Sequence, residues 1–215
     1  MGYRQVGKAP DSDSGISEVR VLLAQPENRQ VQSVLVDFYY SFFTKIGATL
    51  MTKQDIYNFL TSKDIWYDAT EHEAVFTMNE LTDIEIPYPE ADAKNLFVRD
   101  DKKQNYFLIT VRGNKRVNIR EFRRTFGTRP LSFASAEELF DILALTPGSV
   151  TPFGLLNDDE RKVRLILDSD FRKEPGLIGI HPNDNTATVC LRTDDLTNII
   201  TEHGNSVEFY DIKTL

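Results

Sequence analysis

The sequence predicts an α+β domain with a mixed, curved sheet and surrounding helices. Predicted helices and strands are interspersed along residues 51–215, without the regular strand–helix–strand alternation that builds a doubly wound parallel sheet. The chain has 215 residues, which suits one domain of ordinary size with an appendage. Its composition, 40% hydrophobic and 27% charged, is that of a soluble globular protein and is too apolar for a disordered one.

Residues 1–50 are predicted to be an N-terminal extension of unknown role that is partly flexible, ahead of a domain at residues 51–215. Residues 1–20 combine Gly, Pro, Ser and Asp without apolar periodicity, as flexible tails do. The apolar run at residues 34–43 is interrupted by Asp37 and is far shorter than the ~20 residues that a membrane-spanning helix needs. We therefore expect no membrane segment.

The first half of the domain begins with a capped helix. Thr52 is a helix-capping residue type, Asp55 follows three residues later, and an apolar stripe comes after both. A charged turn at residues 100–104 separates two apolar runs, as expected for a hairpin with a polar loop. The strands predicted in this half are residues 65–67, 74–76, 96–99 and 106–111.

Capping signals predict three further helices. Asn118 begins a short helix that Gly127 ends, Ser135 opens a capping box for the next, and Thr193 caps a helix that ends at Gly204. The strands predicted in this half are residues 163–167, 177–180, 187–191 and 207–210.

The cysteine and histidine content argues against metal chemistry. Cys190 is the single cysteine, which excludes an internal disulfide and fits a reducing compartment. It lies in an apolar strand pattern with no nearby base, so we interpret it as a core residue. With three histidines, no metal cage is expected, and no metal or cofactor is predicted. Because residues 11–14 are acidic and Ser-rich where a secretory signal would be basic, we expect a cytoplasmic protein.

The formal net charge of −8 argues against broad, unspecific nucleic-acid binding, so no DNA partner is predicted. Residues 94–129 are nevertheless locally basic. Taken alone, a basic segment of this kind is more often a solvated surface than a binding site. Its basic residues are Lys94, Arg99, Lys102, Lys103, Arg112, Lys115, Arg116, Arg120, Arg123, Arg124 and Arg129.

Three loops beside predicted strands hold polar or backbone-permissive residues, and scaffolds often place functional groups in such loops. They are residues 93–95, 146–154 and 181–186. In the second loop two prolines stiffen the backbone, while two glycines let a ligand approach it closely. Such a loop can present peptide N–H groups to an oxyanion, although each loop alone also fits an ordinary turn.

Four ordered motifs resemble those of the YbaK/prolyl-tRNA-synthetase-associated family, most closely its free-standing members. The motifs are Lys94-Asn95-Leu96-Phe97, Leu131-Ser132-Phe133-Ala134-Ser135, Pro147-Gly148-Ser149-Val150-Thr151-Pro152-Phe153-Gly154 and His181-Pro182-Asn183-Asp184-Asn185-Thr186-Ala187-Thr188. The resemblance covers roughly residues 51–212. It implies the fold of the editing insertion found in bacterial prolyl-tRNA synthetases.

The resemblance also implies roles for individual residues. Lys94 corresponds to the functionally central lysine of the family, Asn95 to its polar neighbour, and His181 to a residue that shapes the amino-acid pocket. Whether His181 acts as a base or as pocket wall stays open. Gly148 and Pro152 fill a GxxxP loop that holds the terminal adenosine and the aminoacyl group. The predicted catalytic group is Lys94, Asn95 and His181, and the predicted substrate-binding group is Gly148, Ser149, Pro152, Phe153, Gly154, Asn183 and Asn185.

Two positions depart from the family pattern. Glu73 follows His72 where the family has proline, so a role for His72 is not carried over. Many relatives approach the lysine through a Pro-Gly-x-His/Cys-Thr stretch, whereas this chain has Pro89-Glu90-Ala91-Asp92-Ala93. The second departure leaves the preferred substrate less defined than the reaction.

The activity implied by the resemblance is trans-editing: hydrolysis of the ester of a mischarged proline tRNA, chiefly the alanine ester. A proline synthetase cannot exclude the smaller alanine sterically, since a lost methylene contact discriminates by only ~1–3 kcal/mol. Two alternatives remain: the cysteinyl ester handled by the YbaK branch, and a non-catalytic tRNA-binding or regulatory module. The implied partner is the aminoacylated acceptor end of proline tRNA, with prolyl-tRNA synthetase or an elongation factor as further candidates.

Overall fold

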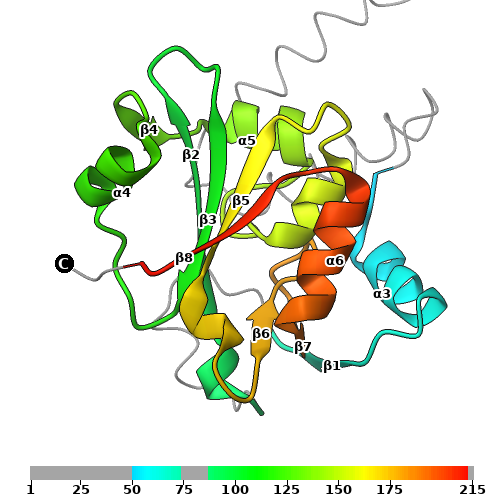
Figure 1. The fold of residues 1–215 in the computed structure, drawn as a ribbon. Coiled ribbons are helices and arrows are strands. Elements are labelled where there is room, and N and C mark those ends of the chain that lie inside the picture. The colour runs from blue at the N-terminus through cyan, green and yellow to red at the C-terminus, as the bar shows by residue number, and fades with distance from the viewer. Residues whose placement is uncertain (1–49, 74–86, 213–215) are drawn as a thin grey trace, which may run out of the picture. The chain divides into compact units, whose positions relative to one another are not determined.

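The computed structural model describes residues 50–73 and 87–212 (Figure 1). The predicted N-terminal extension and the strand predicted at residues 74–76 lie outside them. The helices are α3 (Lys53–Ser62), α4 (Ile119–Phe126), α5 (Ala136–Leu143) and α6 (Thr193–His203), with the 3-10 turns η2 (Pro89–Ala91), η3 (Pro152–Asn157) and η4 (Ser169–Arg172). The strands are β1 (Tyr67–Glu71), β2 (Ala93–Asp100), β3 (Tyr106–Arg112), β4 (Leu131–Phe133), β5 (Val163–Asp168), β6 (Leu177–Ile180), β7 (Ala187–Arg192) and β8 (Val207–Tyr210).

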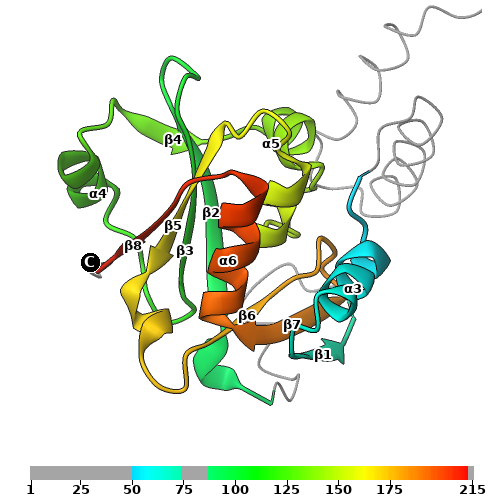
Figure 2. The ribbon, with the colours of Figure 1, turned by 45° about the vertical axis from the view of Figure 1, so that its right-hand side comes forward.

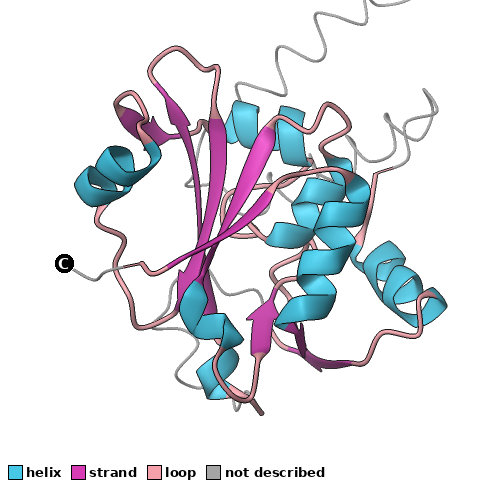
Figure 3. Ribbon diagram, viewed as in Figure 1, coloured by secondary structure: helices cyan, strands magenta, loops and turns pink. Residues whose placement is uncertain are grey.

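Two sheets organise these elements (Figure 3). The larger has the strand order β4-β2-β3-β5-β8, in which β2 pairs antiparallel with both neighbours while β3, β5 and β8 run parallel. The smaller is antiparallel, with the order β1-β7-β6. The mixed sheet and the α+β class predicted from the sequence are therefore confirmed.

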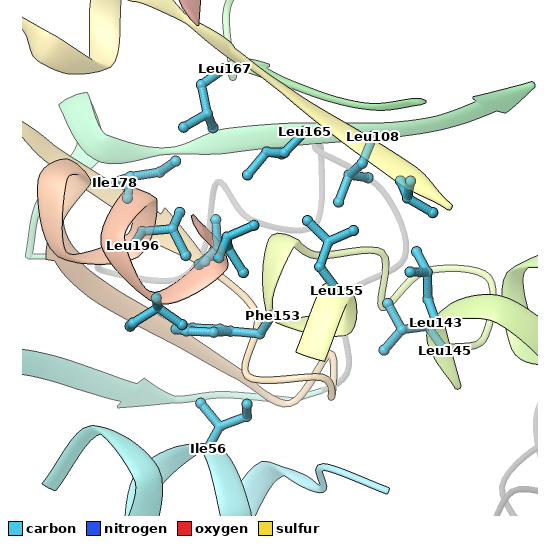
Figure 4. Packing of buried hydrophobic residues seen from close by; sticks show 14 of the residues in the cluster. Ile56, Leu108, Leu143, Leu145, Phe153, Leu155, Leu165, Leu167, Ile178 and Leu196 are labelled. Carbon is cyan, nitrogen blue, oxygen red and sulfur yellow. The ribbon is translucent and has the colours of Figure 1, made fainter. Parts of the chain in front are cut away.

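Apolar side chains cover both faces of the larger sheet. Alternation along β3 sends Leu108 to one cluster and Phe107 and Ile109 to the other. The first cluster packs against α5, α6, η3, the smaller sheet and α3, and Figure 4 shows Phe153 and Leu155 at its centre. The second cluster lies under α4. Figure 2 shows α4 and α6 on opposite sides of the larger sheet.

Helix caps are the best-predicted features. The capping boxes of Thr52 and Ser135 both form, and Asn118 accepts a hydrogen bond at the start of α4. Gly127 ends α4 at a φ of 61° and Gly204 ends α6 at 108°, where glycine is the favoured residue.

Two local assignments are wrong. Thr193 is the first residue of α6 and Arg192 is its N-cap; the Thr193 hydroxyl donates to the carbonyl of Phe171 at 2.8 Å. The strand expected at residues 65–67 begins only at Tyr67, where pairing with Leu191 of β7 sets its register. A short strand, β4, was not predicted at all.

The assignment of Cys190 to the core is confirmed. It lies in β7, is 4% exposed, and burial raises the pKa of its thiol to about 12. At neutral pH the side chain is a neutral thiol, which is neither a nucleophile nor a metal ligand.

We propose that the independent domain starts by Met51. The Met51 N–H donates to Asn157 Oδ1 at 2.8 Å, and its carbonyl accepts from Asn183 Nδ2 at 2.7 Å. The side chains of Asn157 and Asn183 therefore hold the backbone of Met51 in place at the start of the domain. Nothing in this anchoring requires residues before Leu50.

A shortened chain that begins at Leu50, behind an initiating methionine, is therefore expected to keep its solubility and its thermal midpoint. Circular dichroism melting measures the midpoint. Loss of solubility or a lowered midpoint relative to the full chain would show that the preceding residues contribute to the domain.

Candidate active site

The site begins where the start of β2 meets the end of β6. Asp92 and Gly179 form a parallel bridge, and the carbonyl of Asp92 accepts from the N–H of Gly113 at 2.9 Å. A Cβ atom on Gly179 would lie 3.4 Å from the carbonyl oxygen of Ala91, which is an ordinary van der Waals contact. The bridge holds the loop that follows β6 beside the strand that carries Lys94.

Lys94 and Asn95 stand on opposite faces of β2. Lys94 pairs with Val111 and Asn95 with Thr110 across the β2–β3 ladder. Asn95 Oδ1 accepts a hydrogen bond from Thr110 Oγ1 at 2.8 Å, which orients the amide and leaves its Nδ2 as the donor. The two predicted residues are adjacent in the chain, but their side chains serve different sides of the strand.

His181, which follows β6, is partly buried. Its Nδ1 lies 2.9 Å from the carbonyl oxygen of Ala187, so Nδ1 carries the proton and Nε2 is the acceptor of the neutral ring. Burial lowers the pKa of His181, and the nearby His72 lowers it further. At neutral pH the ring is therefore uncharged and able to accept a proton at Nε2.

The loop at residues 146–154 is tied to His181. Thr151 is fully buried, and its Oγ1 donates to the carbonyl of His181 at 2.6 Å. Gly148 has a φ of 96°, a backbone conformation that favours glycine. Ser149 Oγ donates to the carbonyl of Thr146 at 2.9 Å, so this hydroxyl stabilises the turn itself.

The end of the same loop belongs to the core. Pro152 is buried, and Phe153 is 0% exposed within the first cluster. A side chain on Gly154 would lie 2.5 Å from Leu145 Cδ1, so this position packs against an apolar side chain. Phe153 and Gly154 can reach a substrate only through their backbone, whereas Gly148 lies at the turn of the loop.

The residues after His181 form a tight polar turn. Asn183 has a φ of 61°, is 6% exposed, and uses its amide to hold Met51. Asp184 Oδ1 accepts from the Thr186 N–H at 2.8 Å, and Thr186 Oγ1 accepts from Lys53 Nζ at 2.9 Å. Asn185 is half-buried within this turn. The Nδ2 of Asn183 therefore has a structural role, while its buried Oδ1 has no hydrogen-bond partner among the described residues.

Sequence reasoning missed three residues of the site. His72 lies with its ring 6.2 Å from that of His181, and its Nε2 is 3.1 Å from Thr188 Oγ1. Thr151 links two loops, and no local pattern distinguishes it from an ordinary loop threonine. Asp92 lies in the stretch at residues 89–93, where the chain departs from the family pattern. That departure was the signal in the sequence that could have identified it.

Asp92 gives the site a carboxylate. Burial raises the pKa of Asp92, while the positive charge of Lys94 acts in the opposite direction. Asp92 directly precedes β2, two residues before Lys94. Among the described residues, no group of three or more His, Cys, Asp and Glu side chains is arranged to hold a metal ion.

Comparison with known proteins gives a consistent picture. The model of the aminoacyl-tRNA editing domain matches residues 72–199. The prolyl-tRNA editing protein ProX of Acetoanaerobium sticklandii is 34% identical over 160 residues, which cover 74% of this chain and 97% of ProX. Prolyl-tRNA synthetase associated domain-containing protein 1 of Danio rerio is 31% identical, over 80% of this chain and 93% of its own.

A crystal structure of a candidate trans-editing enzyme for prolyl tRNA synthetase shares the fold, with a TM-score of 0.58 at 18% identity, over 78% of this chain and all of its own (100%). The architecture is thus that of an aminoacyl-tRNA editing domain. The chain belongs to the aminoacyl-tRNA editing domain family. The family and the enzyme class predicted from the four motifs, an aminoacyl-tRNA deacylase, are confirmed. Within the described part of the chain, no helix is long and apolar enough to cross a membrane.

Proposed function

We propose that this protein deacylates mischarged proline tRNA in trans and that alanine is the amino acid it removes. The name of the relative ProX, a prolyl-tRNA editing protein, supports editing of prolyl-tRNA. One observation in this chain supports the proposal: two contacts link the predicted site segments. The Asp92–Gly179 bridge joins the strand of Lys94 to the strand before His181. The hydrogen bond from Thr151 to His181 joins the Gly148 loop to the same histidine. The bound partner in this proposal is the aminoacylated acceptor end.

The reaction needs no protein nucleophile. Water adds to the ester carbonyl, the bond between the acyl carbon and the ribose oxygen breaks, and free amino acid and tRNA are released. Neutral His181 accepts a proton from the water at Nε2, or lines the pocket while the adjacent ribose hydroxyl assists. The loop around Gly148 supplies backbone N–H groups to the oxyanion, and Lys94 binds a phosphate or ribose of the terminus.

In this proposal Asp92 binds the amino-acid part of the substrate. An aminoacyl ester carries an α-ammonium group, and a partly buried carboxylate is the side chain best suited to bind it. The raised pKa of Asp92 means that this carboxylate becomes protonated at a higher pH than an ordinary aspartate. Deacylation of alanyl-tRNA should therefore decline as the pH falls through that raised value, because the bound ammonium loses its counter-charge.

Replacing Asp92 by asparagine is expected to lower kcat/KM for alanyl-tRNA at least about tenfold, since a hydrogen bond to a charged group contributes ~1.5–3 kcal/mol. The control substrate is N-acetyl-alanyl-tRNA, which lacks the ammonium. It should be a poor substrate for the natural protein and should respond little to Asp92→Asn. Equal losses on both substrates would assign Asp92 a structural role instead.

The function itself is tested with alanyl-, cysteinyl-, seryl- and prolyl-esters of the same proline tRNA. Preferential hydrolysis of the alanyl ester is the expected outcome. Preference for the cysteinyl ester would place the chain with the YbaK type of activity, and no hydrolysis of any ester would favour a binding or regulatory module. Prolyl-tRNA synthetase and an elongation factor stay predicted partners, and the cytoplasm stays the predicted compartment.

A further inference from the structure

Most of the basic segment at residues 94–129 divides into two parts, to which Lys94, Lys102 and Arg112 do not belong. One part is neutralised by carboxylates. Arg99 and Lys103 pair with Glu138 at 3.3 and 3.2 Å. Lys115 pairs with Asp168 and Asp170 at 2.8 and 2.7 Å, and Arg129 pairs with Asp101 at 2.6 Å. These ion pairs link loops and strands, so the positive charges of these side chains are largely neutralised within the domain.

The other part surrounds α4 and keeps its positive charge. Among the described residues, no carboxylate lies within ion-pair distance of Arg116, Arg120 or Arg123. Arg124 is 3.9 Å from Glu121 with 82% of its side chain exposed, and a pair of that kind contributes little. Arg120 and Arg124 are four residues apart and therefore lie on one side of α4.

The inner side of α4 is occupied differently. Phe122 packs on Phe107 of β3 with ring centroids 5.6 Å apart, and Phe126 packs on Tyr210 at 5.2 Å. The helix is thus anchored by aromatic rings, while Arg120 and Arg124 are exposed and Arg123 is half-buried, with its Nε buried. Next to them lies a surface cavity of about 760 Å³, lined by Val117, Asn118, Ile119, Arg120, Glu121 and Arg124.

The arginines of α4 lie on the same side of the larger sheet as Lys94. Alternation along β2 puts Lys94 on the face of Val98, which packs with Phe122 in the second cluster. The chain also runs from Val111, opposite Lys94, directly through residues 113–118 into α4. Figure 1 shows α4 beside β4, which pairs with the end of β2, so the start of β2 with Lys94 lies further along the same strand.

We propose that Arg116, Arg120, Arg123 and Arg124, here called the α4 arginine face, bind the phosphate backbone of the acceptor stem. This inference rests on the proposed function, because a tRNA whose end reaches Lys94 must extend its stem away from the site. The net charge of −8 disfavours unspecific RNA binding, so an unneutralised basic face both attracts the stem and sets its direction.

The test uses the full chain with Arg120→Glu and Arg124→Glu together. The matched control carries Lys63→Glu and Lys162→Glu, which change the net charge equally at two exposed lysines on other elements. The probe is an RNA hairpin that carries no amino acid, with the acceptor-stem sequence of proline tRNA and a 3′ CCA end. Binding is measured by fluorescence anisotropy over a series of salt concentrations.

The α4 variant is expected to bind the hairpin at least about tenfold more weakly, with the slope of log K against log salt reduced by about one for each lost phosphate contact. For alanyl-tRNA, KM should rise while kcat changes little. The control should stay close to the natural protein. Unchanged binding by the α4 variant, or an equal loss in the control, overturns the inference; unchanged binding would instead favour an acidic protein as the partner of this face.

The same measurements separate this inference from the proposed function. If the natural protein binds the hairpin through the α4 arginine face yet hydrolyses none of the four esters, the surface stands and the deacylase proposal fails. If it hydrolyses alanyl-tRNA but the α4 variant shows the natural KM and hairpin affinity, the deacylase proposal stands and the surface fails.

Discussion

Replacing Lys94 by alanine is expected to lower kcat/KM for alanyl-tRNA about 10- to 150-fold, because a hydrogen bond to a charged group contributes ~1.5–3 kcal/mol when it persists in the transition state. Lys94 lies at the start of β2, where the bridge between Asp92 and Gly179 brings the two sheets together. Its side chain is assigned to the substrate and not to the core. The thermal midpoint should therefore hardly move.

Lys102→Ala is the matched control, since it removes an exposed lysine from the turn between β2 and β3. That variant should retain both activity and stability. Lys94→Arg keeps the positive charge but changes its geometry, so partial activity is expected from it. Hydrolysis of alanyl-tRNA at the natural rate by a well-folded Lys94→Ala protein would remove the central residue from the proposed mechanism.

Phe153→Ala should have the larger effect on stability. Phe153 is 0% exposed at the centre of the first cluster, and truncation of a buried phenylalanine costs about 3–5 kcal/mol through lost transfer energy and the cavity left behind. A loss of this size lowers the thermal midpoint on the order of 10 °C in a domain of this length. Chemical denaturation with unchanged m-value measures the free energy of unfolding directly.

The comparison with Phe153→Leu separates packing from substrate contact. Leucine keeps most of the apolar volume, so it should recover much of the lost stability. Well below the melting range, both variants should deacylate alanyl-tRNA at rates that follow their folded fractions. A strong loss of activity in a fully folded Phe153→Leu protein would show instead that the ring contacts the substrate.

The sequence predicted the features that short-range chemistry determines. A capping box needs only residues three positions apart, so Thr52 with Asp55 and Ser135 with Glu138 could be identified without any tertiary information. Helix ends at Gly127 and Gly204 follow from backbone preference alone. Two of the four motifs likewise located loops of the candidate site, because each loop is a contiguous run of residues. The loop predicted at residues 93–95 is wrong, because these residues begin strand β2.

Contacts between distant segments could not be read in the same way. The register of β1 depends on β7, more than a hundred residues later, and a local apolar pattern cannot report it. For the same reason, the sequence could not predict the hydrogen bond from Thr151 to His181 or the ion pair between Lys115 and Asp168. Phe153 lies in a loop motif, yet its ring belongs to the core, because a motif does not specify which way each side chain points.

The bonds that hold Met51 also bear on how the protein is made. Its N–H and carbonyl join side chains 106 and 132 residues further along the chain. Contacts of such long range close late, since a large loop must be ordered before they form. During synthesis, neither β1 nor the turn after His181 can take its final place until β7 has left the ribosome. A nascent chain that already displays Lys94 and the Gly148 loop therefore still lacks the histidine side of its site, so hydrolytic activity should emerge only near the end of translation.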